Sequence, residues 1–445
     1  RQLNGSLPKR VVKPKALAMP GKAVFSEFDK GSGDRAVSTT MAFAVMLRDL
    51  LRDADVGARI VPIIPDEART FGLDALFRQF GIYASTGQLY TPVDADLQLS
   101  YHEAKDGQIL EEGITEAGAM ASMTAAGTSY SVLGQPMIPF YLFYSMFGFQ
   151  RVGDLIWAFG DARGRGFLMG ATAGRTTLEG EGLQHDDGHS LVLASTHPSL
   201  RAYDCAFAYE LAAVVADGIR RMYGPEPEDR FYYLTLYNEN YPMPALPEGE
   251  DEEAVRNGIL DGLYRYAPAP PSEEVTGNGR VRRATILFSG PAWSAAMEAR
   301  DLLAGEWGVA AECWSATSYK ALREDALEAE RWNRLHPGAP GRQPRVTDLL
   351  GGAEGPIVAV TDFMKAVPDQ VARWVPGVFR TLGTDGWGRS DARATLRRYF
   401  EVDSHHVVLA VLAALAEVGE GKTEEVAEAI RRYGIDPEAP DPVKL

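Results

Sequence analysis

The residue best placed for acid–base chemistry is Glu116, in the stretch Gln-Ile-Leu-Glu-Glu-Gly-Ile-Thr-Glu-Ala-Gly-Ala at positions 108–119. We expect a short strand before it and a helix that holds it about one turn from the start and runs on to Ser129. Alanine and glycine dominate that helix, which leaves room for a flat molecule, and Ile114 offers an apolar wall. A carboxyl group buried there without a basic partner would have a raised pKa and would hold a proton at neutral pH. Taken alone, these residues fit better with a packed helix that carries one surface acid at its start.

Aromatic residues and an arginine follow a second expected strand, at positions 137–144. Tyr144 and Phe147 stand at its end, shortly before Arg151. Such a cluster belongs more often to a core than to a cofactor site, because large rings dominate cores. The end of a strand is also where a flat heteroaromatic ring could stack, so both interpretations stay open.

His185 and His189 lie in a glycine-rich run, positions 160–188, that we expect to form one long loop. Their spacing would suit two metal ligands on a helix, but Gly188 disfavours a helix and a third ligand is not evident, so we predict no metal site. The run also lacks the spacing of a phosphate loop. An imidazole titrates near neutral pH, which makes His185 a candidate general acid–base or hydrogen-bond donor.

Asp66 and Glu67 follow a third expected strand, at positions 59–64. Ligands bind at the carboxyl ends of strands in open parallel sheets, so both acids are candidates for contact with a substrate. A helix N-cap with first-turn charges explains the same two residues equally well.

The elements that must position these residues form two α/β patterns. In the first, a helix begins at Ser38, strands are expected at 59–64, 137–144 and 231–237, and a helix at 203–222. In the second, strands are expected at 285–288, 310–314, 357–361 and 378–382, with helices at 293–303 and 364–374. Alternation of strand and helix predicts parallel sheets with covered faces, so the fold class is α/β with two doubly wound domains.

Proline, glycine and acidic residues mark the boundaries between these patterns. We expect an N-terminal arm or linker at 1–37, a first domain at 38–247, a linker at 248–280 with a short structured piece around 259–266, and a C-terminal domain at 281–445.

Composition limits the classes of function. With 445 residues, 45% hydrophobic and 24% charged, the chain can fill sizeable cores. A net charge of −16 repels nucleic acid and anionic lipid, so we expect neither as a partner. Only Cys205 and Cys313 occur, which fits free thiols in a reducing cytosol. We find no long apolar run or signal core and expect a cytoplasmic protein without a membrane span.

Three runs together resemble the first component of the bacterial homodimeric pyruvate dehydrogenase complex. They are Asp-Glu-Ala-Arg-Thr-Phe-Gly at 66–72, Pro-Met-Ile-Pro-Phe-Tyr-Leu-Phe-Tyr-Ser-Met-Phe-Gly-Phe-Gln-Arg at 136–151 and Gly-Glu-Gly-Leu-Gln-His-Asp-Asp-Gly-His at 180–189. The resemblance extends from about Ser38 to the C-terminus, and it covers only the later part of that family's chain, its pyrimidine-binding and C-terminal domains. It implies a thiamin-diphosphate-binding fold followed by a transketolase C-terminal-like domain.

The resemblance also implies thiamine diphosphate as cofactor. The family's conserved acid stands at Glu116, its active-site histidine at His185, and its aminopyrimidine pocket at Tyr144, Phe147 and Arg151. A protonated acid that hydrogen-bonds the pyrimidine ring favours the imino tautomer, whose nitrogen then takes the proton of the thiazolium carbon. The histidine would donate to the substrate or stabilise an oxyanion.

In that family a preceding domain binds the diphosphate and Mg²⁺. Thr-Asp-Gly in segment 383–390 is not the Gly-Asp-Gly that opens the diphosphate-and-magnesium motif of thiamine enzymes, so we expect a turn and N-cap there. The chain starts at Arg1 without a methionine, and we expect a fragment, a processed product or one subunit of a split enzyme. It would need a diphosphate-binding partner chain or missing N-terminal domain, in a dimer or heterotetramer.

Three functions stay open. The chain could be the pyrimidine-binding half of a thiamine-dependent pyruvate dehydrogenase that passes an acyl group to the lipoyl arm of an acyltransferase. It could instead belong to a split thiamine-dependent enzyme that forms carbon–carbon bonds, or be a non-catalytic scaffold subunit. The joint presence of Glu116, Tyr144, Arg151 and His185 argues against the scaffold, whereas the sequence says nothing about the acceptor.

Overall fold

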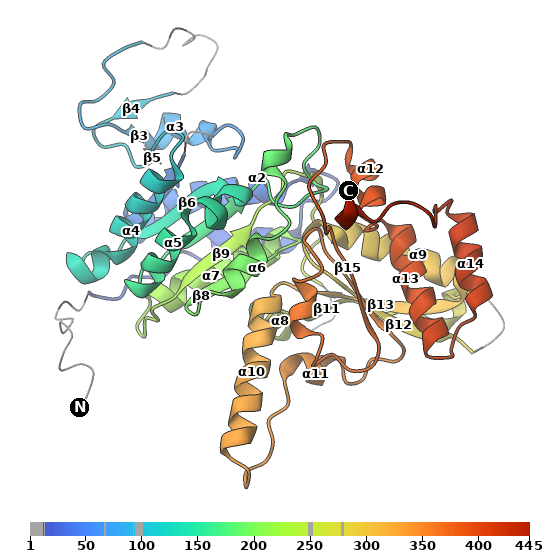
Figure 1. Ribbon diagram of the computed structural model, residues 1–445. Helices are drawn as coiled ribbons and strands as arrows, with labels where there is room; N and C mark the ends of the chain where they lie inside the picture. Colours follow the sequence, from blue (N-terminus) through green and yellow to red (C-terminus); the bar gives the residue numbers. More distant parts are fainter. Residues whose placement is uncertain are drawn as a thin grey trace.

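The chain folds into two α/β lobes that lie side by side (Figure 1). This computed structural model describes residues 12, 14–65, 68–91, 93, 101–247, 252–276 and 280–445. We call residues 14–247 the first lobe and residues 252–445 the second lobe. In Figure 1 the first lobe runs from blue to yellow-green, and the second runs from yellow to red.

A six-stranded sheet forms the centre of the first lobe. Its order is β5-β2-β6-β7-β9-β8, and all its neighbouring strands are parallel. The strands are β2 (Ile60–Ile64), β5 (Leu110–Glu111), β6 (Ile138–Tyr144), β7 (Phe167–Ala171), β8 (Leu200–Tyr203) and β9 (Phe231–Thr235). Most of their residues are buried, as expected for a parallel sheet covered on both faces.

Helices cover both faces of this sheet, and strand β6 shows how its side chains divide. Phe140 and Leu142 belong to one core with α2 (Thr39–Arg52) and α7 (Ala208–Tyr223). Tyr141 and Phe143 belong to the opposite core with α4 (Glu116–Val132), α5 (Gly148–Asp161) and α6 (Ser190–Ser195). Alternate residues of a strand point to opposite faces, so this division is the signature of a doubly wound sheet.

Shorter elements surround the first sheet. The N-terminal arm contains α1 (Ala23–Ser26), which packs on α7, and β1 (Ala36–Val37), which pairs with β10 (Tyr241–Pro242). A two-stranded sheet of β3 (Ile82–Tyr83) and β4 (Glu103–Ala104) projects from the lobe beside α3 (Asp74–Phe80), as Figure 1 shows.

A second sheet, of five strands in the order β11-β13-β12-β14-β15, forms the centre of the second lobe. Strand β11 (Tyr264–Ala267) is antiparallel to its neighbour, and β12 (Arg282–Phe288), β13 (Val309–Ser315), β14 (Ile357–Val360) and β15 (Phe379–Leu382) are parallel. Helices α9 (Trp293–Trp307) and α13 (Ser404–Glu417) pack with Ile286 and Phe288 on one face. Helices α10 (Tyr319–Leu335) and α11 (Arg345–Leu350) share the other core with Leu287. The remaining helices of this lobe are α8 (Glu252–Asp261), α12 (Arg393–Tyr399) and α14 (Thr423–Arg432).

The expected doubly wound α/β fold is confirmed, and three local expectations are wrong. Positions 160–188 do not form one loop, because they contain the central strand β7. The helix expected from position 203 begins at Ala208, since Tyr203 belongs to β8. The helix expected at 364–374 is reduced to the 3-10 turn Pro368–Val371, which begins at its proline because that residue lacks the N–H needed inside a longer helix. The expected linker at 248–280 holds α8 and β11, so the second sheet begins before position 281; the domain boundaries stay predictions.

A continuous apolar core joins the two lobes. The ring of Phe207, at the start of α7, lies 6.1 Å from that of Phe288 in β12 and 5.6 Å from that of Trp293 in α9. All three sit in or against one buried cluster that also contains α2 and α13 residues. The lobes are therefore packed together as one body.

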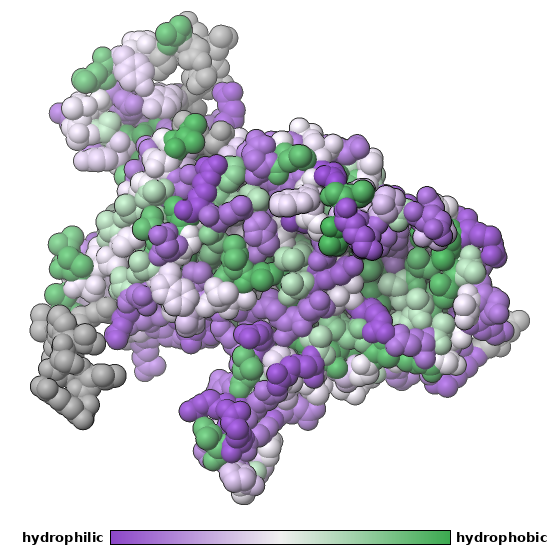
Figure 2. Space-filling model, viewed as in Figure 1, coloured by the Kyte–Doolittle hydropathy of each residue, from purple (hydrophilic) through white to green (hydrophobic). Residues whose placement is uncertain are grey.

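One apolar stretch, Arg393–Glu417, has the length and composition of a helix that could cross a membrane. It consists of α12 and α13, and 56% of its most apolar window is buried inside the protein. Figure 2 shows hydrophobic residues gathered near α9 and α13, whereas hydrophilic residues predominate along α10. The burial is typical of a core helix.

Candidate active site at the carboxyl edge of the first sheet

Glu116 is the first residue of helix α4. The N-cap is Thr115, whose Oγ1 accepts a hydrogen bond from Gly118 N at 3.2 Å. The helix therefore begins at Glu116, and the expectation that it starts a turn earlier is wrong. The Glu116 side chain is 12% exposed, and the N-terminal end of a helix favours a negative charge.

Arg151 pairs with this carboxylate. Its Nη1 donates to Glu116 Oε1 at 3.0 Å, and its guanidinium lies 3.8 Å from the centre of the Phe147 ring. The expectation that Glu116 lacks a basic partner is therefore wrong. The sequence could not show this pair because α4 and α5 meet only in the folded chain. The Arg151 side chain is 50% exposed, so an entering molecule can displace it from Glu116.

Aromatic rings form a wall beside the pair. The Tyr144 ring stacks on the His185 ring with centroids 4.6 Å apart and an interplanar angle of 17°. Phe147 meets the His185 ring edge-on at 5.5 Å and the Tyr144 ring at 6.0 Å. Phe71, which sequence reasoning missed, packs edge-on against Tyr144 at 5.4 Å. The structure thus brings Glu116, Arg151, Phe147, Tyr144 and His185 into one continuous set of contacts.

His185 is the last residue of the 3-10 turn η5 (Leu183–His185), in the loop between β7 and α6. Its Nδ1 lies 3.3 Å from Glu181 Oε2. Glu181 is a second site residue that sequence reasoning missed, although an acid four positions before a histidine is a common spacing for an ion pair. Glu181 therefore occupies Nδ1 of His185 and leaves Nε2 for a ligand. His189 has separate partners, Gln150 and Asp187. Among the described residues, no three His, Cys, Asp or Glu side chains gather as a metal site.

Other acidic and hydroxyl groups surround this edge of the sheet. Tyr141 donates its hydroxyl proton to the backbone carbonyl of Glu116 at 3.3 Å. Burial, followed by the charges of Glu116 and Glu112, raises the pKa of Tyr141, so it stays a donor. Glu112 is held differently from Glu116, because its carboxylate accepts a hydrogen bond from Ser122 Oγ. Burial also raises the pKa of Asp186, next to His185, to about 7.

The structure tests the predicted role of Ile114 but not those of the two acids that follow β2. The Ile114 side chain is 78% exposed, so it does not form a buried apolar wall, and its contact with a cofactor stays a prediction. Asp66 and Glu67 lie outside the described residues. Glu116 follows β5, Tyr144 ends β6, and His185 lies in the loop that follows β7, so all three lie at the carboxyl edge typical of ligand binding in parallel sheets.

This arrangement fits a flat, nitrogen-containing ring. Tyr144 and Phe147 are only partly buried and offer stacking surface, and Glu116 offers a carboxyl group for a ring nitrogen once Arg151 turns away. His185 lies on the far side of Tyr144 as a hydrogen-bond donor or acceptor for a second molecule.

Comparison with known proteins assigns both lobes. Residues 19–244 match the family of the pyruvate dehydrogenase E1 component middle domain, and residues 272–403 match the transketolase-like C-terminal domain. The pyruvate dehydrogenase E1 component of Mycolicibacterium smegmatis is 53% identical over 436 residues, which are 98% of this chain and 46% of that protein. The same component of Pseudomonas aeruginosa is 52% identical over 442 residues, 99% of this chain and 49% of that protein.

Solved structures agree on the fold. A transketolase from Leishmania mexicana has a TM-score of 0.64 at 15% identity, and the match covers 91% of this chain and 49% of the transketolase. A structure titled "Split gene transketolase, inactive beta4 tetramer" has a TM-score of 0.55 at 16% identity and covers 85% of this chain and 98% of its own. The fold is transketolase-like α/β. The chain spans about half the length of the curated relatives it matches, and it belongs to the pyruvate dehydrogenase E1 component family.

Proposed function

We propose that this chain is the pyrimidine-binding half of a thiamine diphosphate-dependent pyruvate dehydrogenase component. The observation that carries the proposal is the Glu116 carboxylate at the start of α4, beside partly exposed aromatic rings and within reach of a displaceable arginine. Thiamine diphosphate, when bound, supplies the nucleophilic carbon that attacks a 2-oxo acid and the electron sink for loss of carbon dioxide.

Glu116 holds a proton against the pyrimidine ring nitrogen. The entering ring takes the place of Arg151 beside the carboxyl group, so that Glu116 contacts the ring nitrogen and no longer the guanidinium. Tyr144 and Phe147 orient the ring by stacking. His185, fixed between the Tyr144 ring and Glu181, donates a hydrogen bond to the carboxylate or carbonyl oxygen of the 2-oxo acid and stabilises the charge that develops there.

In this proposal, a partner chain or a missing N-terminal domain binds the diphosphate and Mg²⁺. Two findings support it: the chain spans about half the length of its curated relatives, and it aligns with nearly all of one subunit of a split transketolase. We propose a dimer or heterotetramer in the cytoplasm that passes its acyl group to a lipoyl acyltransferase. The second candidate, a split carbon–carbon bond-forming enzyme, shares the Glu116 site and differs only in the acceptor.

Calorimetric titration with thiamine diphosphate and Mg²⁺ tests whether this chain needs a partner to bind the cofactor tightly. We expect weak binding by this chain alone and tight, Mg²⁺-dependent binding after a partner with the Gly-Asp-Gly motif is added. Tight binding by the isolated chain would contradict the proposal. In the reconstituted complex, pyruvate should acetylate a lipoyl domain; transfer only to an aldehyde would favour the second candidate, and turnover of neither would favour a scaffold.

A further inference from the structure

The loop at residues 174–188, which carries His185, is held by the second lobe. At its beginning, the Asp362 carboxylate, which follows β14, accepts hydrogen bonds from Arg175 N at 3.2 Å and Thr176 N at 3.0 Å. It also accepts from the hydroxyl groups of Thr176 at 2.6 Å and Thr177 at 3.1 Å. Asp362 is 2% exposed, so the second lobe inserts a buried acceptor into a turn of the first.

Gly174 allows this close approach. A Cβ at Gly174 would overlap Asp362 Oδ2, and its φ of 86° lies in the left-handed region that favours glycine. The backbone of the turn at Gly174 therefore packs directly against the Asp362 carboxylate.

The second lobe also holds the end of the loop. Met364 N donates to the Gly188 carbonyl at 2.9 Å, and Gly388 packs so closely on Asp186 that a Cβ there would overlap it. The Arg175 guanidinium donates to the carbonyl groups of Thr384 and of Gly386. Segment 383–390, which the sequence marks only as a turn, thus contacts the loop at Arg175 and at Asp186.

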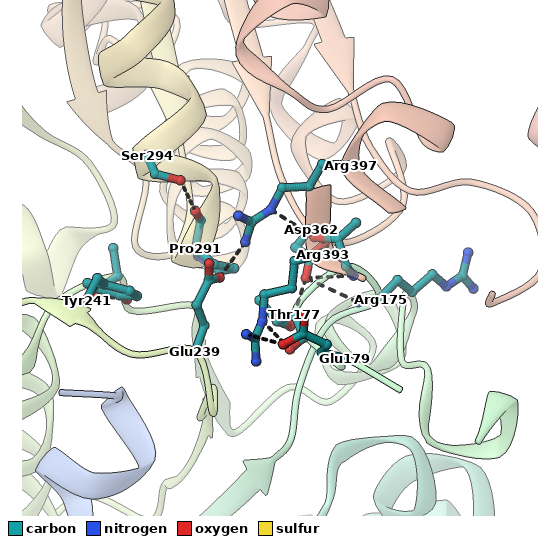
Figure 3. A network of polar contacts seen from close by, with 12 residues as sticks. Arg175, Thr177, Glu179, Glu239, Tyr241, Pro291, Ser294, Asp362, Arg393 and Arg397 are labelled. Carbon is teal, nitrogen blue, oxygen red and sulfur yellow. Dashed lines mark hydrogen bonds and ion pairs between the residues drawn. The ribbon is translucent and has the colours of Figure 1, made fainter. Parts of the chain in front are cut away.

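Helix α12 adds contacts to the first part of the loop. Arg393 donates to the Thr177 carbonyl at 3.0 Å and pairs with Glu179 at 2.9 Å. Arg397 donates to Thr176 Oγ1 at 3.4 Å and also pairs with Glu239. Figure 3 shows Arg393 beside Thr177 and Glu179, and Arg397 beside Glu239, near Asp362.

We propose that the second lobe positions His185, by holding the loop at residues 174–188 at both ends, with Asp362 as the main positioning residue. His185 lies nine positions after Thr176 and three before Gly188, and only the short turn η5 gives the loop local structure. A segment with so little structure of its own is ordered by contacts at its ends. The importance of this for catalysis rests on the proposed role of His185.

Asp362→Asn in the full chain is the test. Asparagine keeps the shape but replaces one carboxylate oxygen by an amide donor, so a hydrogen bond from the backbone N–H of Arg175 or Thr176 is lost. We expect amide hydrogen exchange at residues 174–188 to accelerate by about tenfold or more. The ¹³C-labelled His185 ring signal, assigned by its loss in His185→Gln, should move toward that of an exposed histidine as its stack on Tyr144 loosens.

Asp204→Asn is the matched control. Asp204 is also a buried acid at the lobe interface, but it accepts from Thr235 and Tyr237 and not from the loop. It should leave the exchange at residues 174–188 and the His185 signal unchanged. The proposal is overturned if Asp362→Asn leaves both readouts at wild-type values, or if Asp204→Asn changes them equally.

Thr176 supplies a second pair of variants in case Asp362→Asn does not fold. Thr176→Val removes the hydroxyl donor and should accelerate exchange in the loop, whereas Thr176→Ser keeps the donor and should restore wild-type behaviour. Equal exchange in the two variants would overturn the proposal. None of these readouts needs a cofactor or partner. If His185→Gln keeps full activity in the reconstituted enzyme while Asp362→Asn still mobilises the loop, the proposed role of His185 fails and the positioning stands.

Discussion

Replacement of Glu116 by glutamine separates proton transfer from folding and binding. The side chain keeps its shape and its place at the start of α4 but can no longer carry a proton between its oxygen and a ring nitrogen. Loss of a general acid–base group typically slows a reaction by roughly 10²–10⁴, which corresponds to about 2.7–5.4 kcal/mol of barrier. The lost pair with half-exposed Arg151 is worth at most about 1 kcal/mol of stability, so the fold should survive.

The assay is hydrogen–deuterium exchange at the thiazolium carbon in the reconstituted enzyme, because it reports ionisation without the substrate or acceptor steps. Glu112→Gln is the control, since the Glu112 carboxylate bonds to Ser122 and has no proposed role. We expect the control to exchange within about threefold of wild type, in contrast to the loss expected for a general acid–base residue. Exchange at the wild-type rate in Glu116→Gln would refute the assignment of Glu116.

Two further predictions concern the surroundings of His185. Tyr144→Leu removes the ring on which His185 stacks, a contact worth about 0.5–1.5 kcal/mol, so the His185 ring signal in NMR spectra should shift; an unchanged signal would contradict the stack. Burial raises the pKa of Asp186 from 3.8 to about 7, so the folded protein favours the protonated carboxyl group. The contribution of this group to the free energy of unfolding is therefore lost as the pH rises from about 4 through about 7. Asp186→Asn mimics the protonated form, and its thermal midpoint should fall less than that of wild type across this range; parallel pH profiles would contradict the prediction.

Sequence reasoning succeeded where buried strands form continuous apolar runs. Strands β6, β12 and β13 were predicted within a few residues because parallel strands covered on both faces are apolar throughout. It failed at β7, where Gly166 and Gly170 gave the pattern of a loop. In the fold these glycines allow close packing against Pro139 and Tyr233, which no local pattern reveals.

The candidate site was found only in part from the sequence. Glu116 and His185 were singled out by residue type, and the resemblance added Tyr144, Phe147 and Arg151 to the same pocket. The structure places all five in contact. The pairing of Arg151 with Glu116 was missed because it depends on how α4 packs against α5. The hydrogen bonds between Asp362 and the loop join residues 186 positions apart, and neither segment has a sequence pattern that predicts them.

The rings of Phe207, Phe288 and Trp293 give the molecule a thermodynamic property that neither sheet has alone. Because these side chains pack in or against one buried apolar cluster, separating the lobes would expose aromatic surface to water. Heating should therefore melt both lobes in a single cooperative transition. A protease that cuts the chain between the lobes would then leave two pieces that remain associated through their hydrophobic contact.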